Sequence, residues 1–292
     1  MFPIHLNIPQ WGIFIPYYEG LYYVISFIVA YLYAAKRFKK FGLSVETLQN
    51  SFLWIIIGAV LLARTFHFVF WDLKTLTADP AIFLQFWGGG YSITGGLLGG
   101  FLGGWGYYLW KKQNFWQTFA VASPAVFLGQ AIGRVGCFLN GDAWGIPTNL
   151  PWGIREPKYG HNLFGLQLNT QYPSPAWTWS VSQGFTKPDS LVTVPLHPTQ
   201  LYESLGDLGL MVLAILLVNA LAKQGKNWYR VALFHLGGYS LLRFALEFLH
   251  GDRDVTVWAD MTSLQINLFI FGALCIGAFF ITGRKQKTLR AS

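Results

Sequence analysis

The sequence predicts an all-α integral membrane protein with seven transmembrane helices. Of its 292 residues 53% are hydrophobic and only 12% are charged, whereas a soluble domain carries about 25% charged residues. Several apolar runs approach or exceed the roughly 20 residues that a spanning helix needs. Basic residues follow alternate runs. We therefore expect one polytopic membrane domain over residues 1–292.

The seven apolar runs and the basic clusters between them predict the topology. The runs cover about 20–35, 50–71, 92–110, 117–137, 199–222, 230–250 and 263–283. The clusters after the first, third, fifth and seventh runs hold 13 of the 21 Lys and Arg residues and lie at 36–40, 111–112, 223–230 and 284–290. By the positive-inside rule, the N-terminus is outside and the C-terminus inside. Because the net charge of +8 lies mainly at helix ends, no nucleic-acid partner is expected.

Two further features limit the class of protein. The start of the chain lacks a basic leader, so the first run is expected to act as its own insertion signal. Cys137 and Cys275 lie in different apolar runs and have no zinc-ligand spacing. We therefore expect no disulfide framework, no metal site and no cofactor.

Residues 143–197 differ in composition from the rest of the chain. They contain seven prolines and several Trp, Asn and Ser residues over about 55 positions. By the topology above this segment lies outside the membrane. It is longer than an ordinary connection, so it forms either a small head or a mobile lid.

The run 92–110 contains the pattern GGLLGGFLGGWG. Two rows of glycines recur at a spacing of four residues: Gly95, Gly99 and Gly103, and Gly96, Gly100 and Gly104. This spacing is typical of a smooth helix face that packs tightly on a neighbouring helix. Tight packing is favoured over the alternative, a groove for a lipid tail.

Charged side chains inside the runs are the candidate functional residues. An unpaired charge in the membrane is costly, so it predicts a functional site. Arg243 and Glu247 are four residues apart and could simply neutralise each other. The arginines nevertheless outnumber the nearby carboxylates, which favours an anionic ligand such as a lipid phosphate. The candidates, all in the expected outer half, are Arg64, Arg134, His197, Tyr202, Glu203, Arg243 and Glu247.

Four segments resemble one known family. GRVGCFLNGDAWG (133–145) resembles the signature of the bacterial phosphatidylglycerol–prolipoprotein diacylglyceryl transferases, which reads roughly Gly-Arg-x-Gly-Asn-Phe-x-Asn-x-Glu-x-x-Gly. HPTQLYE (197–203), RFALE (243–247) and YSITGGLLGG (91–100) resemble further motifs of that family. Its seven-helix arrangement with the N-terminus outside agrees with the topology expected here.

The resemblance implies a reaction and its partners. These enzymes transfer the diacylglyceryl group of phosphatidylglycerol to the lipobox cysteine of a prolipoprotein signal peptide. A thioether forms and glycerol-1-phosphate leaves. The implied location is the bacterial cytoplasmic (inner) membrane, in contact with membrane lipids.

The resemblance also implies roles for individual residues. Arg134 and Arg243 would hold the phosphate, and Asn140 would orient the polar head. Asp142 and Glu247 would position the arginines or the thiol, which completes the catalytic set. The substrate-binding set is Arg64, Gly133, Gly136, Gly145, His197, Gln200, Tyr202 and Glu203, with Gly145 keeping the backbone clear of the substrate.

The chain departs from the family pattern where thiol activation is expected. Thr94 stands where the family usually has a histidine, and threonine cannot act as a base near neutral pH. His67 or His197 could act instead, the arginines could stabilise the thiolate, or the acceptor could differ. Asp142 replaces a glutamate. Cys137 replaces an asparagine, and packing is favoured over a reactive thiol there.

Two other functions stay open from the sequence. One is a paralogue that acts on another lipid or thiol acceptor. The other is a phospholipid-binding or transport protein that uses the same arginines without chemistry. Transporters more often show inverted repeats, and we find no such repeat in the sequence.

Overall fold

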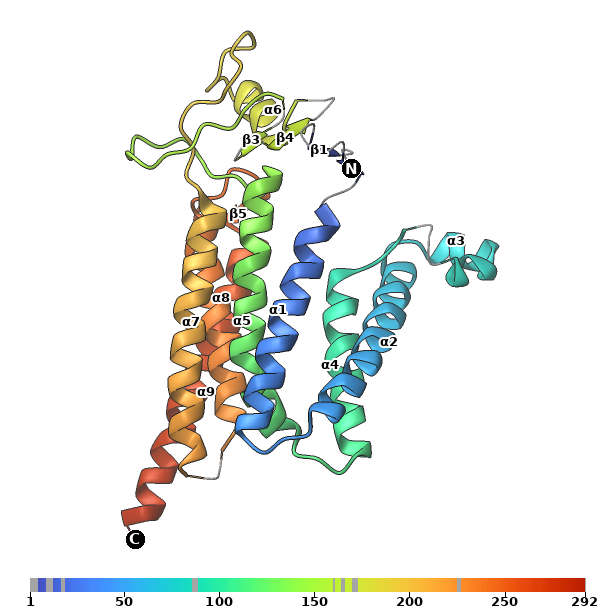
Figure 1. Cartoon of the computed structure of the whole chain (residues 1–292), viewed down its shortest axis with the longest axis vertical. Helices are drawn as coiled ribbons and strands as arrows, with labels where there is room; N and C mark the ends of the chain where they lie inside the picture. The colour runs from blue at the N-terminus through green and yellow to red at the C-terminus, as the bar shows by residue number, and fades with distance from the viewer. Residues whose placement is uncertain are drawn as a thin grey trace. The chain divides into compact units, whose positions relative to one another are not determined.

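The computed structural model describes residues 5–8, 13–16, 19–85, 89–159, 161–163, 166–169, 173–224 and 227–291. Seven long helices in this part of the chain overlap the seven apolar runs (Figure 1). They are α1 (Glu19–Lys40), α2 (Val45–Phe70), α4 (Ile93–Trp110), α5 (Phe115–Asn140), α7 (Thr199–Ala222), α8 (Tyr229–Glu247) and α9 (Ser263–Ala291). Short helices α3 (Leu73–Ala78) and α6 (Pro175–Ser182) and the 3-10 turn η2 (Pro80–Leu84) lie in connections.

Four of the described helices, α2, α5, α7 and α9, are long and apolar enough to cross a membrane. Their outward-facing side chains agree with a lipid environment: Leu213 on α7 and Leu274 on α9 are 51% and 68% exposed. Such exposure is unfavourable in water and favourable in a bilayer. The protein is therefore a mainly helical, multi-pass membrane protein.

A small antiparallel sheet is the part of the fold that the expected all-α class did not include. Its strands are β1 (His5–Ile8), β2 (Ile13–Pro16), β3 (His161–Leu163) and β4 (Leu166–Asn169), in the order β2-β1-β4-β3. Leu6 pairs with Ile15 on one side and with Leu168 on the other. The segment 143–197 therefore shares its sheet with the start of the chain. A second hairpin, β5 (Thr256–Trp258) and β6 (Met261–Thr262), connects α8 to α9.

The chain divides into two compact units, residues 35–121 and residues 1–34 with 122–292. In the first unit the glycine face of α4 packs on α2. A Cβ atom on Gly95, Gly99 or Gly103 would collide with the backbone of Leu62, Gly58 or Trp54, respectively. The second glycine row of α4 also faces α2, at ordinary contact distances for Gly96 and Gly100. This confirms the predicted tight packing and explains why larger residues would separate the two helices.

In the second unit α5 and α7 run antiparallel and are joined by a hydrogen bond. The Ser204 hydroxyl donates to the carbonyl oxygen of Ala131 over 2.9 Å. The hydroxyl of Ser123 and Nδ1 of His235 make a buried bond of 2.8 Å between α5 and α8. Helices α8 and α9 pack where Gly237 meets Cys275 and Ile276. These contacts hold α5, α7, α8 and α9 together.

Candidate functional site

A buried carboxylate joins the ends of three helices. Glu203, in the second turn of α7, pairs through Oε2 with Nε of Arg134 on α5. Its other oxygen, Oε1, lies 3.3 Å from Nη1 of Arg243 on α8. Arg243 also pairs with Glu247, one turn further along α8. The structure thus brings together four residues that the sequence singled out in three separate motifs.

The two kinds of charge differ in their access to the surroundings. The carboxylate-bearing side chains of Glu203 and Glu247 are each 4% exposed, whereas those of Arg134 and Arg243 are 24% and 19% exposed. The carboxylates therefore lie behind the guanidinium groups. Arginine presents five donors in a planar fork. A guanidinium that is held by a carboxylate and still accessible can place further donors on an anion.

The residues Arg134, Glu203, Arg243 and Glu247 form a charged cluster. His250 belongs to this cluster and was not predicted from the sequence. Its Nε2 lies 2.9 Å from Oε1 of Glu203, and its Nδ1 lies 2.9 Å from Oδ1 of Asp252. The ring is 1% exposed, while the side chain of Asp252 is 37% exposed. Burial alone would lower the pKa of His250, but the hydrogen bonds to Asp252 and Glu203 raise it above its ordinary value. His250 lies three residues after Glu247, a spacing that would place both on one helix face, and this could have predicted its place in the cluster.

The charge balance of the cluster differs from the one expected. Asp207 lies one helical turn beyond Glu203 on α7 and is 1% exposed. Its Oδ1 is buried and has no hydrogen-bond partner among the described residues. Two arginines, Arg134 and Arg243, therefore lie with three buried carboxylates. The expected surplus of arginine was wrong for this unit, because Asp207 was not counted and Arg64 belongs to the other unit.

Hydrogen bonds from side chains to the backbone join the motif 197–203 to the motif 133–145. Gln200 donates through Nε2 to the carbonyl oxygen of Asp142 over 2.6 Å, and the Thr199 hydroxyl donates to that of Ala143 over 2.7 Å. A Cβ atom on Gly145 would collide with the backbone of His197. Gly145 is therefore needed for close approach of the two motifs. The side chain of Asn140 lies outside the described residues.

The other motif residues make contacts of several kinds. Nδ1 of His197 lies 3.2 Å from the hydroxyl of Tyr202, which accepts a 2.7 Å bond from Nε1 of Trp152. Burial lowers the pKa of His197, which favours its neutral form. A Cβ atom on Gly136 would collide with Tyr22 of α1. A Cβ atom on Gly133 would lie 3.9 Å from Oγ of Ser26 on the same helix, an ordinary contact distance, so the close approach of α1 depends on Gly136.

Arg64 has a different environment in the unit 35–121. It is 1% exposed and donates to the carbonyl oxygens of Phe83 over 2.7 Å and Gln85 over 2.9 Å. It also donates to the carbonyls of Ile82 and Gly89. Its guanidinium lies over the rings of Phe68 and Tyr91. These contacts hold residues 82–85 and Gly89 beside α2. In the same unit, Thr94 is an exposed residue of the first turn of α4.

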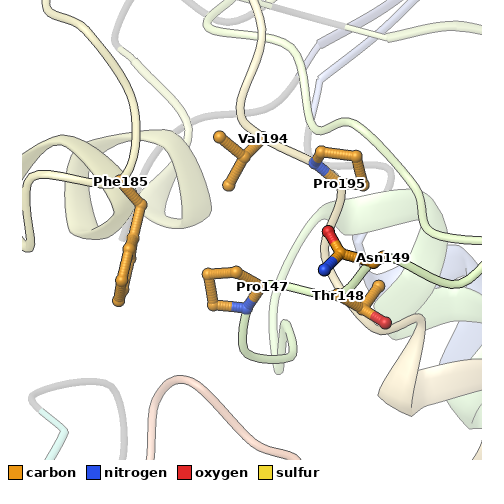
Figure 2. A pocket seen from close by; sticks show the side chains of 6 residues that line it. All are labelled: Pro147, Thr148, Asn149, Phe185, Val194 and Pro195. Atoms are coloured by element: carbon orange, nitrogen blue, oxygen red, sulfur yellow. The ribbon is translucent and has the colours of Figure 1, made fainter.

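A cavity of about 330 Å³ lies within the segment 143–197, and none of the charged residues of the cluster lines it (Figure 2). Figure 2 shows Phe185 on one side and Pro195 on the other, with Pro147 between them. Pro147 and Pro195 are two of the seven prolines of the segment 143–197, but none of the lining residues was predicted to belong to a site. The lining residues are Pro147, Thr148, Asn149, Phe185, Val194 and Pro195.

The comparison with protein families covers nearly the whole chain. The family described as "Prolipoprotein diacylglyceryl transferase" matches residues 3–281. The chain belongs to this family. The resemblance inferred from the four motifs is thus confirmed.

Curated relatives agree with the family assignment. A protein of Gloeobacter violaceus (strain ATCC 29082 / PCC 7421) is 30% identical over 284 residues, covering 96% of this chain and 94% of the relative. One of Aromatoleum aromaticum (strain DSM 19018 / LMG 30748 / EbN1) is 32% identical over 234 residues, covering 78% and 75%. One of Pseudomonas syringae pv. syringae (strain B728a) is 26% identical over 269 residues, covering 89% and 87%. All three carry the name phosphatidylglycerol–prolipoprotein diacylglyceryl transferase.

Proposed function

We propose that this chain transfers the diacylglyceryl group of phosphatidylglycerol to the lipobox cysteine of prolipoprotein signal peptides. The cysteine sulfur, as thiolate, attacks the glyceryl carbon that bears the phosphate. A C–S bond forms, the C–O bond breaks, and glycerol-1-phosphate leaves with the electron pair of that bond. The thiol proton passes to a base or to the solvent. Family membership and the names of the relatives support this reaction.

The observation that carries the site assignment is the convergence of Arg134 and Arg243 on Glu203. The leaving phosphate gains negative charge as the C–O bond breaks. Accessible guanidinium donors held at one place stabilise that charge without reorganisation. Glu203 and Glu247 keep the two guanidinium groups in place, and binding of the lipid there aligns the reacting carbon with the thiol.

The remaining site residues are proposed in the roles that the motifs imply. Asn140 orients the polar head of the lipid, and Asp142 positions the arginines or the thiol. The hydrogen bond from Gln200 to the backbone of Asp142 supports a role in holding the motif 133–145 beside the motif 197–203. Substrate binding by Arg64, Gly133, Gly136, His197 and Tyr202 stays a prediction. The carbonyl contacts of Arg64 support a role in holding residues 82–85 and Gly89 beside α2.

We further propose that all seven long helices span the bacterial inner membrane, with the N-terminus outside. In this arrangement residues 143–197 form an external head within a single polytopic domain. The cluster then lies in the outer half of the bilayer, at the depth of lipid phosphates. Phosphatidylglycerol, membrane lipids and the signal peptide reach it from that leaflet. The basic residues at helix ends support the orientation.

Thiol activation without the usual histidine follows from the same arrangement. A free cysteine with a pKa near 8.5 is only a few per cent ionised at pH 7. Arginines at the site raise that fraction by stabilising the thiolate. Thr94 therefore needs no catalytic role in this proposal, and His67 and His197 are the alternatives as base.

Complementation of a strain depleted of its own transferase tests the proposed function. The readout is mass analysis of the N-terminal cysteine of a lipoprotein. Restored growth with a diacylglyceryl thioether on that cysteine is the expected result. A folded, membrane-inserted protein that restores neither growth nor the thioether would favour a paralogue with another acceptor or a lipid-binding protein.

A further inference from the structure

Among the described residues, each arginine of the cluster is paired with a buried carboxylate. Arg134 and Arg243 are matched by Glu203 and Glu247. Asp207 adds another buried carboxyl group beside Arg134 and Glu203. A phosphodiester carries one negative charge. The two arginines and their carboxylates together are neutral or negative, which disfavours its binding. An additional cation would remove that disadvantage.

His250 can supply this charge because of what its two ring nitrogens face. Nε2 faces Glu203 and Nδ1 faces Asp252, each at 2.9 Å. An ionised carboxylate only accepts hydrogen bonds, and both nitrogens carry a hydrogen only in the imidazolium form. The charged groups around the ring are Glu203 from α7, Arg243 from α8 and Asp252 from its own loop. The backbone of Gly145 forms an isolated β-bridge with that of His250.

We propose that His250 is a positioning residue whose protonated form allows the arginines to bind the phosphate of phosphatidylglycerol. This inference rests on the proposed function of the cluster. Protonated His250 shares the negative charge of Glu203, so Arg134 and Arg243 can turn part of their donors to the lipid. In neutral His250 one nitrogen becomes an acceptor facing a carboxylate. Glu203 is then neutralised by the two arginines alone, and their donors stay directed at its carboxylate.

The geometry makes lipid binding depend on pH. Burial opposes the charged form of His250, but the hydrogen bonds to Asp252 and Glu203 raise its pKa above the ordinary value, and the charge is lost as the pH rises through that raised value. The phosphodiester does not titrate in that range. We expect the affinity for phosphatidylglycerol to fall about tenfold when His250 becomes neutral, as is typical of coupled binding steps.

The test measures binding of short-chain phosphatidylglycerol to the purified full-length protein in neutral detergent by calorimetry, from about pH 6 to about pH 9. The wild type should lose affinity as the pH rises. His250→Arg, with a permanent charge, should keep the low-pH affinity throughout, and His250→Gln should bind weakly throughout. His235→Gln is the matched control, because His235 lies on α8 but bonds to Ser123. It should keep the wild-type pH dependence.

The outcomes separate this inference from the proposed function. If Arg134→Gln binds the lipid as well as the wild type does, the phosphate site itself is wrong. If Arg134→Gln loses binding while His250→Gln follows the wild-type curve, only the role of His250 is overturned. Should His250→Gln fail to fold, His250→Arg still decides: a loss of affinity with pH equal to that of the wild type contradicts the proposal.

Discussion

Arg134 on α5 and Glu203 on α7 form an ion pair across a helix interface, although they belong to different sequence motifs. The hydrogen bond between Ser204 and Ala131 joins the same two helices next to this pair. The pair therefore holds a partly exposed guanidinium against a buried carboxylate. Removal of Arg134 would leave buried Glu203 with Arg243 and His250 as its remaining partners.

Arginine geometry, rather than charge alone, should decide activity at this site. Arg134→Lys and Arg243→Lys should each lose most of the transferase activity while folding normally. Lysine keeps the charge but lacks the planar donors that contact a carboxylate and a phosphate together. Transfer to a lipobox peptide in detergent measures the effect, with thermal unfolding as the control for folding. Near-normal turnover in both variants would mean that charge balance suffices.

Thr94→Ala should retain substantial activity, because Thr94 is exposed and threonine is no base near neutral pH. At saturating phosphatidylglycerol kcat should rise with pH until the substrate thiol is ionised. The KM for the lipid should rise as the pH passes through the raised pKa of His250 and the ring loses its proton. Loss of all turnover in folded Thr94→Ala would show that Thr94 orients a substrate directly.

His67→Ala and His197→Ala, tested separately, show whether another residue acts as the base. Loss of both turnover and the pH dependence of kcat in one of them identifies that residue as the base.

The orientation in the membrane can be tested with reporter fusions. Fusions after residues 40, 112, 225 and 288 should report a cytoplasmic location, because the basic clusters there follow the odd-numbered runs. A reporter inserted near residue 170 should be external. A tag after residue 112 that is accessible from outside would contradict the seven-helix topology.

The glycine face of α4 should be sensitive to single methyl groups in a position-dependent way. Gly99→Ala places a Cβ against the backbone of Gly58, and the helices α2 and α4 must separate to accept it. We expect a loss of about 1–3 kcal/mol in stability, as for other overpacked sites. Gly106→Ala is the matched control, since nothing lies within 4 Å of its added Cβ. Equal melting temperatures for the two variants in detergent would contradict the packing.

The stability of the protein should also depend on His250 and pH. The folded-state pKa of His250 is raised, so its stabilising contribution is fully present below the ordinary value of about 6.5. That contribution is lost as the pH rises through the raised value. The difference in Tm between the wild type and His250→Gln should therefore be largest at low pH and should shrink on the alkaline side. A difference that grows with pH would have the wrong sign.

The sequence predicted the long helices well because the bilayer imposes a simple signal. A spanning helix must be apolar over its length, and each apolar run overlaps one observed helix. Arg134, Glu203, Arg243 and Glu247 could be found for the same reason, since charges stand out in apolar runs. The observed ion pairs then bring the four together, which the separate motifs alone did not show.

The parts that could not be predicted depend on contacts between distant residues. The pairing of β1 with β4 joins strands of four residues each, too short for a clear alternation of apolar and polar positions. His250 follows the last motif and has an ordinary local sequence. Its role emerges only where α7 brings Glu203 to it. Asp207 was overlooked within the run 199–222, so the charge balance was misjudged.

The central claim is that the arginine cluster binds phosphatidylglycerol for transfer of its diacylglyceryl group. The most direct measurement uses purified protein, phosphatidylglycerol labelled in the glycerol head, and a peptide with a lipobox cysteine. It follows release of labelled glycerol-1-phosphate and formation of the thioether in the same reaction. The account predicts equal amounts of both products for the wild type and little of either for Arg134→Lys. Thioether formation by Arg134→Lys at the wild-type rate would contradict it.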